Sequence, residues 1–355
     1  MAEWDAVATS PIEDAAEREG IALAQDDRNW IKLMIAAGLA IGLCWMVFLH
    51  TYRLDDPDIP AVWQYGFEEG TIARSLAHGH GFSSPFEYAT GRTGPTAWVA
   101  PLYPALAALV FRALGDFGPA PTFALMLLNI ISFALTCVPI YLLARRCFGR
   151  PVALAAGFAW AVIPYFDRWY RWIWDTNLTA LLLVVLLWGT AELAGRNHAI
   201  KWWVGYGVLW GFAALTNPVV VSVLPFAMAW LGWRQRRHCS SVRPVLFAGI
   251  AFLAVIAPWL ARNYVVFHQP VFLRSNLGVE LRLTNIHNHD QSLWEDYHPS
   301  VNPDEALEYV VLGEVRYCRY KMQQAIQFVR TYPREFIWLT WERVKTFWNG
   351  EGGTY

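Results

Sequence analysis

The sequence predicts an all-α polytopic membrane protein with about seven transmembrane helices, interfacial helices in its first outer loop and a short outer α-helical region at its C-terminus. Hydrophobic residues make up 55% of the 355-residue chain, charged residues make up only 16%, and there are 20 tryptophans. These values lie outside the usual range of soluble domains. The formal net charge of −1 argues against a nucleic-acid-binding protein, which would need a strongly basic face.

The first predicted span runs from Ile31 to Leu49 and is long enough to cross a hydrocarbon core of about 30 Å. The polar residues 1–29 precede it as a cytoplasmic tail. They have no basic n-region and no small-residue cleavage site, so the span is predicted to be a retained anchor. The predicted spans are 31–49, 121–144, 152–166, 176–191, two within 201–234, and 244–260.

Charge and length set the topology of these spans. Arg145, Arg146 and Arg150 follow the second span, and the positive-inside rule places them in the cytoplasm. Every residue between Lys201 and Arg234 is uncharged, and one straight helix of that length would measure about 48 Å. We expect Asn217-Pro218 to break it into two short spans. The N-terminus is then inside and the C-terminus outside, with a transmembrane core at 30–263 that includes the outer loop 52–120, and an outer region at 264–355.

Short helices are expected outside the spans. Glu68 to His78 has the pattern of an amphipathic helix that stops at Gly79. Pro101 to Leu114 is apolar but too short to cross the bilayer, and we interpret it as interfacial or re-entrant. In the C-terminal region we expect one helix from Asp304 to Tyr332 and another from Pro333 to Trp348. The apolar face of the last helix is expected to rest on the membrane or on the outer loop.

This topology places acids from two loops on the outer side, at Glu68, Glu69, Asp167 and Asp175. A carboxylate can take the proton of an acceptor hydroxyl or amine, while a second carboxylate or a divalent cation neutralises a leaving phosphate. Arginine side chains are suited to holding that phosphate. The basic residues on the same side are Arg74, Arg92, Arg262 and Arg274.

Structural interpretations of the same residues stay open. Acids beside a membrane are most often solvated loop residues, and Glu68-Glu69 at a helix start also interacts favourably with the helix dipole. His78 and His80 have the spacing of a metal clip, but they flank a glycine, which favours turn chemistry. Arg262 fits an interface anchor as well as it fits a phosphate contact.

Five stretches of the sequence together resemble the GT-C glycosyltransferases of the ArnT and protein mannosyltransferase type, and more narrowly the bacterial RgtA/B/C/D-like branch. They are FEEGTIARSLAHGHGFSSPF, TGPTAWVAPLYP, RRCFGRP, GFAALTNP and PWLARNYVVFHQPVFLRSNLGVEL. The similarity extends from Ile31 to Trp348. It implies a GT-C-like core in an integral protein of the bacterial inner membrane, surrounded by membrane lipids.

The resemblance implies a hexosyl or pentosyl transferase of the cell envelope with a periplasmic active site. It would move a sugar from a polyprenyl-phosphate donor to a lipid, glycan or protein acceptor, with inversion at the sugar carbon and without a nucleic-acid partner. The family's acidic motif in the first outer loop matches Glu68 or Glu69, and its second acid matches Asp175 best. The predicted catalytic residues are Glu68, Glu69 and Asp175; the donor phosphate-binding residues are Arg92, Arg262 and Arg74; and the ligands of a Mg²⁺ or Mn²⁺ cofactor are Glu68, Asp175 and Asp167.

The chain departs from the family in two places. The acidic motif often reads Asp-Glu in relatives, so Glu68-Glu69 leaves the choice of base open. Relatives often continue with further spans, whereas this chain ends at Tyr355, as expected of a short natural form, a truncated product or a protein completed by a partner. The alternative function is a non-catalytic membrane scaffold or a lipid-binding subunit of a glycan-assembly complex. A transporter is disfavoured, because the spans are nearly free of charge and no internal repeat is present.

Overall fold

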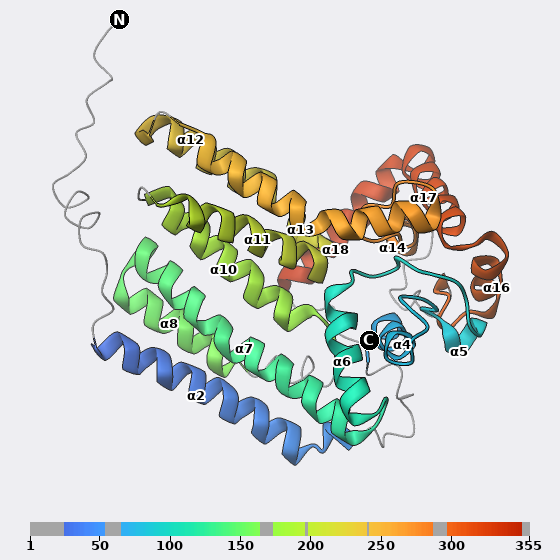
Figure 1. Ribbon diagram of the computed structural model, residues 1–355, viewed down its shortest axis with the longest axis horizontal. Helices are drawn as coiled ribbons and strands as arrows, with labels where there is room; N and C mark the ends of the chain where they lie inside the picture. Colours follow the sequence, from blue (N-terminus) through green and yellow to red (C-terminus); the bar gives the residue numbers. More distant parts are fainter. Residues whose placement is uncertain are drawn as a thin grey trace, which may run out of the picture.

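The computed structural model describes residues 25–53, 65–163, 173–195, 198–239, 241–286 and 297–349, and nearly all of its elements are helices (Figure 1). Within these ranges there is no strand, and extended pairing is limited to one bridge between Ser83 and Pro95. The predicted all-α polytopic fold class is therefore confirmed.

Helices that match the predicted spans lie side by side as a slanted bundle in Figure 1. Four described helices are long and apolar enough to cross a membrane: α2 (Gln25–Phe48), α7 (Pro119–Phe148), α10 (Thr176–Gly195) and α13 (Arg243–Phe267). Shorter helices pack along them, namely α8 (Arg150–Val162) on α7, α11 (Ile200–Thr216) on α13 and α12 (Leu224–Cys239) on α10. The total of about seven spans stays a prediction.

The break predicted inside the long uncharged stretch is confirmed. Helix α11 ends at Thr216, and the 3₁₀-helix η3 (Pro218–Ser222) follows. Pro218 has no N–H to donate, and the side-chain Oδ1 of Asn217 instead accepts a hydrogen bond from the N–H of Val219 at 3.0 Å. Asn217 therefore stands at one end of the bundle with its backbone extended.

Small residues let α11 and α13 approach closely. A Cβ atom on Gly207 would lie 2.0 Å from the carbonyl oxygen of Ala248, and one on Gly211 would lie 2.5 Å from Val255. These glycines are four residues apart and so lie on one face of α11, as in close helix pairs of other membrane proteins. The pairing holds the Asn217 end of α11 in a fixed position beside α13.

Helix α2 begins at Gln25, within the segment that the sequence analysis assigned to the cytoplasmic tail. The reason is Asp27, whose side chain is only 1% exposed. Its carboxylate accepts hydrogen bonds from the hydroxyl of Tyr141 at 2.8 Å, from Arg145, and from Nε of Arg150 at 3.1 Å. An acid expected in solvent thus joins the start of α2 to the end of α7 and the start of α8.

The remaining helices lie mainly at the end of the bundle opposite to Asp27, on the right of Figure 1. They are α4 (Glu68–Ala77), α5 (Glu87–Thr90), α6 (Leu102–Leu114), α14 (Leu277–Leu283), α16 (Pro303–Leu312), α17 (Glu314–Thr331) and α18 (Pro333–Asn349), and the short η1 (Thr51–Arg53) follows α2. The predicted helix from Glu68 to His78 is confirmed as α4. The single helix expected from Asp304 to Tyr332 is wrong, because Gly313, with a φ of 73°, separates α16 from α17.

We expect Asp27→Ala to lower the free energy of unfolding by about 2 kcal/mol, because two arginines would lose their shared buried partner. The value is below that of a fully buried pair because Arg145 and Arg150 remain 21% and 45% exposed. Thermal unfolding of the protein in lipid nanodiscs measures the effect. The matched control is Asp26→Ala, since the Asp26 side chain is 75% exposed. Equal stability of the two variants would contradict this assignment.

Candidate active site

The turn before α4 brings the first outer loop against the residues that precede α10. Gly66 and Phe67 have φ angles of 65° and 49°, a left-handed conformation that is unfavourable for a non-glycine residue. A Cβ atom on Gly66 would lie 1.9 Å from Cδ1 of Trp174, so the indole ring occupies the place of a side chain. Glycine at this position lets the two segments touch.

Glu69 and Asp175 meet beside this contact. The backbone N–H of Asp175 donates to the Glu69 carboxylate, whereas Oε2 of Glu69 is buried and has no hydrogen-bond partner. Burial, with the negative charges of Asp175 and Glu68, raises the pKa of Glu69 well above its usual value. The site thus contains a buried carboxylate oxygen that is free to accept a proton.

Asp175 is buried, which disfavours its charged form, but two neighbouring residues favour that form. The residue is 9% exposed, and burial raises its pKa to about 6, against the opposing effects of a hydrogen bond from the Asn217 side chain and of the Arg274 charge. Asn217 is available because the break before Pro218 leaves it at the end of α11. The residue that divides two helices in the sequence also contacts the second acid.

Arg274 is the basic side chain that acts on both acids. It lies between α13 and α14. Its positive charge partly offsets the rise in the pKa of Glu69 and of Asp175 that burial causes. The sequence analysis placed Arg274 on the outer side but did not assign it to the donor phosphate. Two acids and one arginine from three separate outer segments therefore converge at this end of the bundle.

Glu68 faces a different partner. Its Oε1 lies 3.1 Å from Nε2 of His298, and the two side chains are 13% and 3% exposed. The other ring nitrogen of His298 lies 2.6 Å from the hydroxyl of Ser300. His298 is 230 positions along the chain from Glu68, and no motif in the sequence marks it. The pair joins the first outer loop to the C-terminal region.

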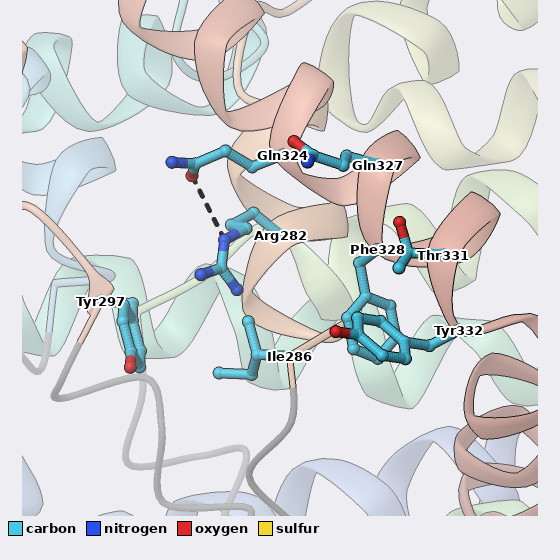
Figure 2. A pocket seen from close by; sticks show the side chains of 8 residues that line it. All are labelled: Arg282, Ile286, Tyr297, Gln324, Gln327, Phe328, Thr331 and Tyr332. Atoms are coloured by element: carbon cyan, nitrogen blue, oxygen red, sulfur yellow. Dashed lines mark hydrogen bonds between the residues drawn. The ribbon is translucent and has the colours of Figure 1, made fainter.

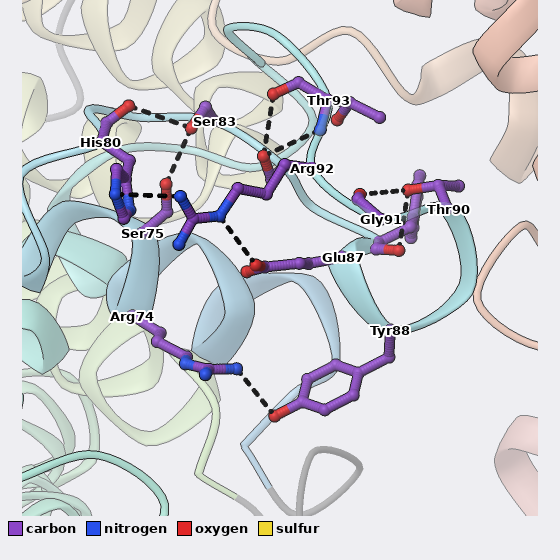
Figure 3. A network of polar contacts seen from close by, with 12 residues as sticks. Arg74, Ser75, His80, Ser83, Glu87, Tyr88, Thr90, Gly91, Arg92 and Thr93 are labelled. Atoms are coloured by element: carbon purple, nitrogen blue, oxygen red, sulfur yellow. Dashed lines mark hydrogen bonds and ion pairs between the residues drawn. The ribbon is translucent and has the colours of Figure 1, made fainter.

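Two of the arginines predicted to bind phosphate belong to a network within the first outer loop (Figure 3). Nε of Arg92 lies 3.2 Å from Oε1 of Glu87, and Nη1 lies 3.1 Å from His80. Nε of Arg74 lies 2.9 Å from Oδ2 of Asp116. The structure thus pairs both guanidinium groups with acids of their own loop rather than with Glu69.

The third predicted phosphate ligand, Arg262, holds the first outer loop to α13. Its terminal nitrogens donate to the backbone carbonyls of Thr96 at 2.6 Å and Phe82 at 3.0 Å. The guanidinium group also lies 4.8 Å from the ring centroid of Trp259. These contacts hold the first outer loop to α13 on both sides of α5.

Glu314 is the residue of this end that sequence reasoning missed most completely. Its two oxygens accept hydrogen bonds from the hydroxyl of Thr96, the N–H of Ala97 at 2.7 Å, the hydroxyl of Ser275 at 2.8 Å and the hydroxyl of Tyr309 at 3.1 Å. Burial still raises the pKa of Glu314. One carboxyl group therefore joins the first outer loop, the residue after Arg274 and the C-terminal helices.

The predicted metal ligands are not gathered into one set in the described part of the chain. Asp167 lies outside the described residues, and within them no three His, Cys, Asp or Glu side chains are placed to hold a metal ion. Glu68 pairs with His298, and Asp175 pairs with Asn217. His78 lies 3.2 Å from Oδ1 of Asp116. Because Asp167 is not among the described donors, the Mg²⁺ or Mn²⁺ cofactor stays a prediction from the sequence.

Comparison with known families agrees with the resemblance seen in the sequence. Residues 98–261 match the model of the dolichyl-phosphate-mannose-protein mannosyltransferase family. This segment is of the GT-C mannosyltransferase type. The matched range contains Asp175 and Asn217, begins after α4 and ends one residue before Arg262. The match covers less than half of the chain, and together with the long apolar helices it supports an integral membrane glycosyltransferase of the GT-C type. No curated protein and no solved structure matches the chain.

We expect Glu314→Gln to lower the free energy of unfolding by about 2 kcal/mol, because one acceptor oxygen becomes an NH₂ group that faces hydrogen-bond donors. Thermal unfolding in nanodiscs provides the measurement. The matched control is Glu342→Gln on α18, whose side chain is 32% exposed and pairs with Lys345 at 2.7 Å. A Glu314 variant as stable as the control would show that this network does not hold the outer elements together.

Proposed function

We propose that this glycosyltransferase moves a sugar from a polyprenyl-phosphate donor to an acceptor at the end of the bundle that carries Glu69 and Asp175. The observation that supports this most strongly is the free, buried Oε2 of Glu69 beside a second acid. Isolated buried acids are costly, and pairs with raised pKa values are typical of catalytic sites. The family match to a mannosyltransferase supports the same chemistry.

The proposed reaction is a single displacement at C1 of the sugar. The acceptor hydroxyl or amine forms a bond to C1, the bond between C1 and the phosphate oxygen breaks, and the polyprenyl phosphate leaves with the bonding electrons. The acceptor proton passes to the Glu69 carboxylate. Its raised pKa makes this carboxylate a stronger base than a glutamate with an ordinary pKa. Glu68 is already paired with His298 and acts by orienting the start of α4.

Arg274 is the group that we assign to the donor phosphate. Its charge reaches both Glu69 and Asp175, and a guanidinium group binds phosphate through paired hydrogen bonds. Arg92, Arg74 and Arg262 already have the partners described above. Since the described residues do not form a divalent cation site, no step of this proposal passes through a metal.

The distribution of positive charge predicts which side of the membrane the site faces. Arg145, Arg146 and Arg150 lie at the end of α7 and the start of α8, which the positive-inside rule assigns to the cytoplasm. Because α10 begins beside Asp175 and α11 ends beside it at Asn217, the acids belong to the opposite end of the bundle. We propose that this end faces the periplasm of a bacterial inner membrane, where a lipid, glycan or protein acceptor is reached.

We expect Glu69→Gln to lower the rate of sugar transfer by at least 100-fold, because the amide cannot take the acceptor proton. The assay follows radiolabelled sugar from a panel of polyprenyl-phosphate donors into total membrane acceptors, with purified protein in lipid, with EDTA and with Mg²⁺ or Mn²⁺. The matched control is Glu87→Gln in the same outer loop, which we expect to retain transfer. Full transfer by the Glu69 variant would refute the assignment of the base.

The rate of transfer should also depend on pH through the acid pair, because Asp175 and the proposed base Glu69 both have raised pKa values. The pKa of Asp175, at about 6, lies above the usual value, so the group is protonated below about pH 6 and charged above it. The charged form is the one that can assist the reaction, and we expect the rate to fall about tenfold from pH 7 to pH 5. Thermal unfolding at each pH checks that the protein stays folded. A rate that does not change over this interval would contradict the role of Asp175.

A further inference from the structure

A pocket of about 530 Å³ lies between α14 and the C-terminal half of α17, outside the acidic site (Figure 2). Its volume falls within the range of small-molecule sites. Its lining combines aromatic rings with hydrogen-bonding side chains. The lining residues are Arg282, Ile286, Tyr297, Gln324, Gln327, Phe328, Thr331 and Tyr332.

The pocket's wall is built on one face of α17. Gln324, Phe328 and Thr331 recur at helical spacing on this face, and Tyr332 follows at the end of the helix. Helix α14 approaches closely on the other side, because a Cβ atom on Gly278 would lie 2.0 Å from the carbonyl oxygen of Cys318. Two packed helices therefore position these side chains.

The polar groups of the pocket are arranged to meet hydroxyl groups. Nε of Arg282 donates to Oε1 of Gln324 at 3.2 Å, and the guanidinium group lies 5.4 Å from the ring centroid of Tyr297. In Figure 2 the terminal nitrogens of Arg282 extend away from Gln324, with Tyr297 on one side and Tyr332 on the other. Amides and a guanidinium group offer both donors and acceptors, as the hydroxyls of a sugar ring require.

Lipid chains fit this lining poorly. Arg282 and Gln324 bond to each other through one atom each, and a polyprenyl or acyl chain in the pocket would offer no hydrogen-bond partner to their remaining polar atoms or to Gln327, at a cost for each group that loses water. A sugar ring satisfies these groups with its hydroxyls, and its C–H face packs on aromatic rings such as Tyr332 and Phe328. The rings of Phe328 and Tyr332 already lie 5.7 Å apart.

The pocket is connected to the acidic site through neighbouring residues. Tyr297 lines the pocket, and the next residue, His298, contacts Glu68 at 3.1 Å. On α14, Glu280 is near enough to Glu68 and His298 for their charges to act on it, and Arg282 follows two positions later. The pocket and the acidic site therefore share two segments of the chain, α14 and residues 297–298.

We propose that this pocket binds a sugar unit of a glycan acceptor and presents the rest of that acceptor to Glu69. This inference rests on the proposed function, because it assigns the acceptor class of the same reaction. It places recognition of the acceptor in the C-terminal region and chemistry at the ends of the bundle helices. The acceptor is then a carbohydrate chain, as opposed to a bare lipid or a peptide.

The test measures binding and transfer separately. Saturation-transfer NMR is recorded on full-length protein in nanodiscs, with water-soluble glycans released from the envelope of cells that make this protein as the probe. We expect Gln324→Ala and Tyr332→Ala to weaken glycan binding at least tenfold and to raise the KM for acceptor while leaving slow release of donor sugar to water unchanged. The matched control is Gln323→Ala, which is exposed on the same helix and does not line the pocket.

The results distinguish the pocket from the catalytic assignment. Glu69→Gln should bind glycans as the wild-type protein does and fail to transfer sugar. Wild-type affinity in both pocket variants, or no glycan binding by folded wild-type protein, would overturn the proposal for the pocket. Full transfer by the Glu69 variant would instead refute the proposed function, while the pocket would still be judged on its own binding data.

Discussion

The structure of the outer end depends on keeping two carboxylic acids, Glu69 and Asp175, together and largely out of water. Burial and mutual repulsion both oppose ionisation of such a pair. The surrounding groups reduce this cost: the N–H of Asp175 binds one acid, the Asn217 amide binds the other, and Arg274 lies near both. Each of these groups comes from a different segment, so the site exists only when all these segments are packed.

Three devices bring the segments together. The contact of Trp174 with Gly66 joins the loop before α4 to the start of α10. Arg262 joins the loop before α6 to α13 through backbone carbonyls. Glu314 then connects that loop to the C-terminal helices through four hydrogen bonds. Arg262, which the sequence analysis predicted to bind phosphate, and Glu314, which it missed, therefore build the scaffold, whereas Oε2 of Glu69 has no hydrogen-bond partner.

Much of the fold could be predicted from the sequence, because apolar length, proline and glycine act locally. The helix at Glu68, the break at Asn217-Pro218 and the helical class follow from such signals. The site was predicted only in part. The two loops that supply acids could be identified from charge and topology, but the contacts of His298 and Glu314 join residues more than 200 positions apart and leave no local pattern. The burial of Asp27 and the break at Gly313 were missed for a related reason, since tertiary partners decide whether an acid is solvated and where a helix ends.

The most direct measurement of the central claim is an electron cryomicroscopy structure of the protein in nanodiscs with a non-hydrolysable polyprenyl-phosphonate sugar. The account predicts the phosphonate against Arg274, with C1 of the sugar facing Oε2 of Glu69 and the prenyl chain leaving along the bundle. A sugar phosphonate bound at Arg92 and Arg74, with Glu69 and Asp175 still enclosed and away from C1, would contradict it.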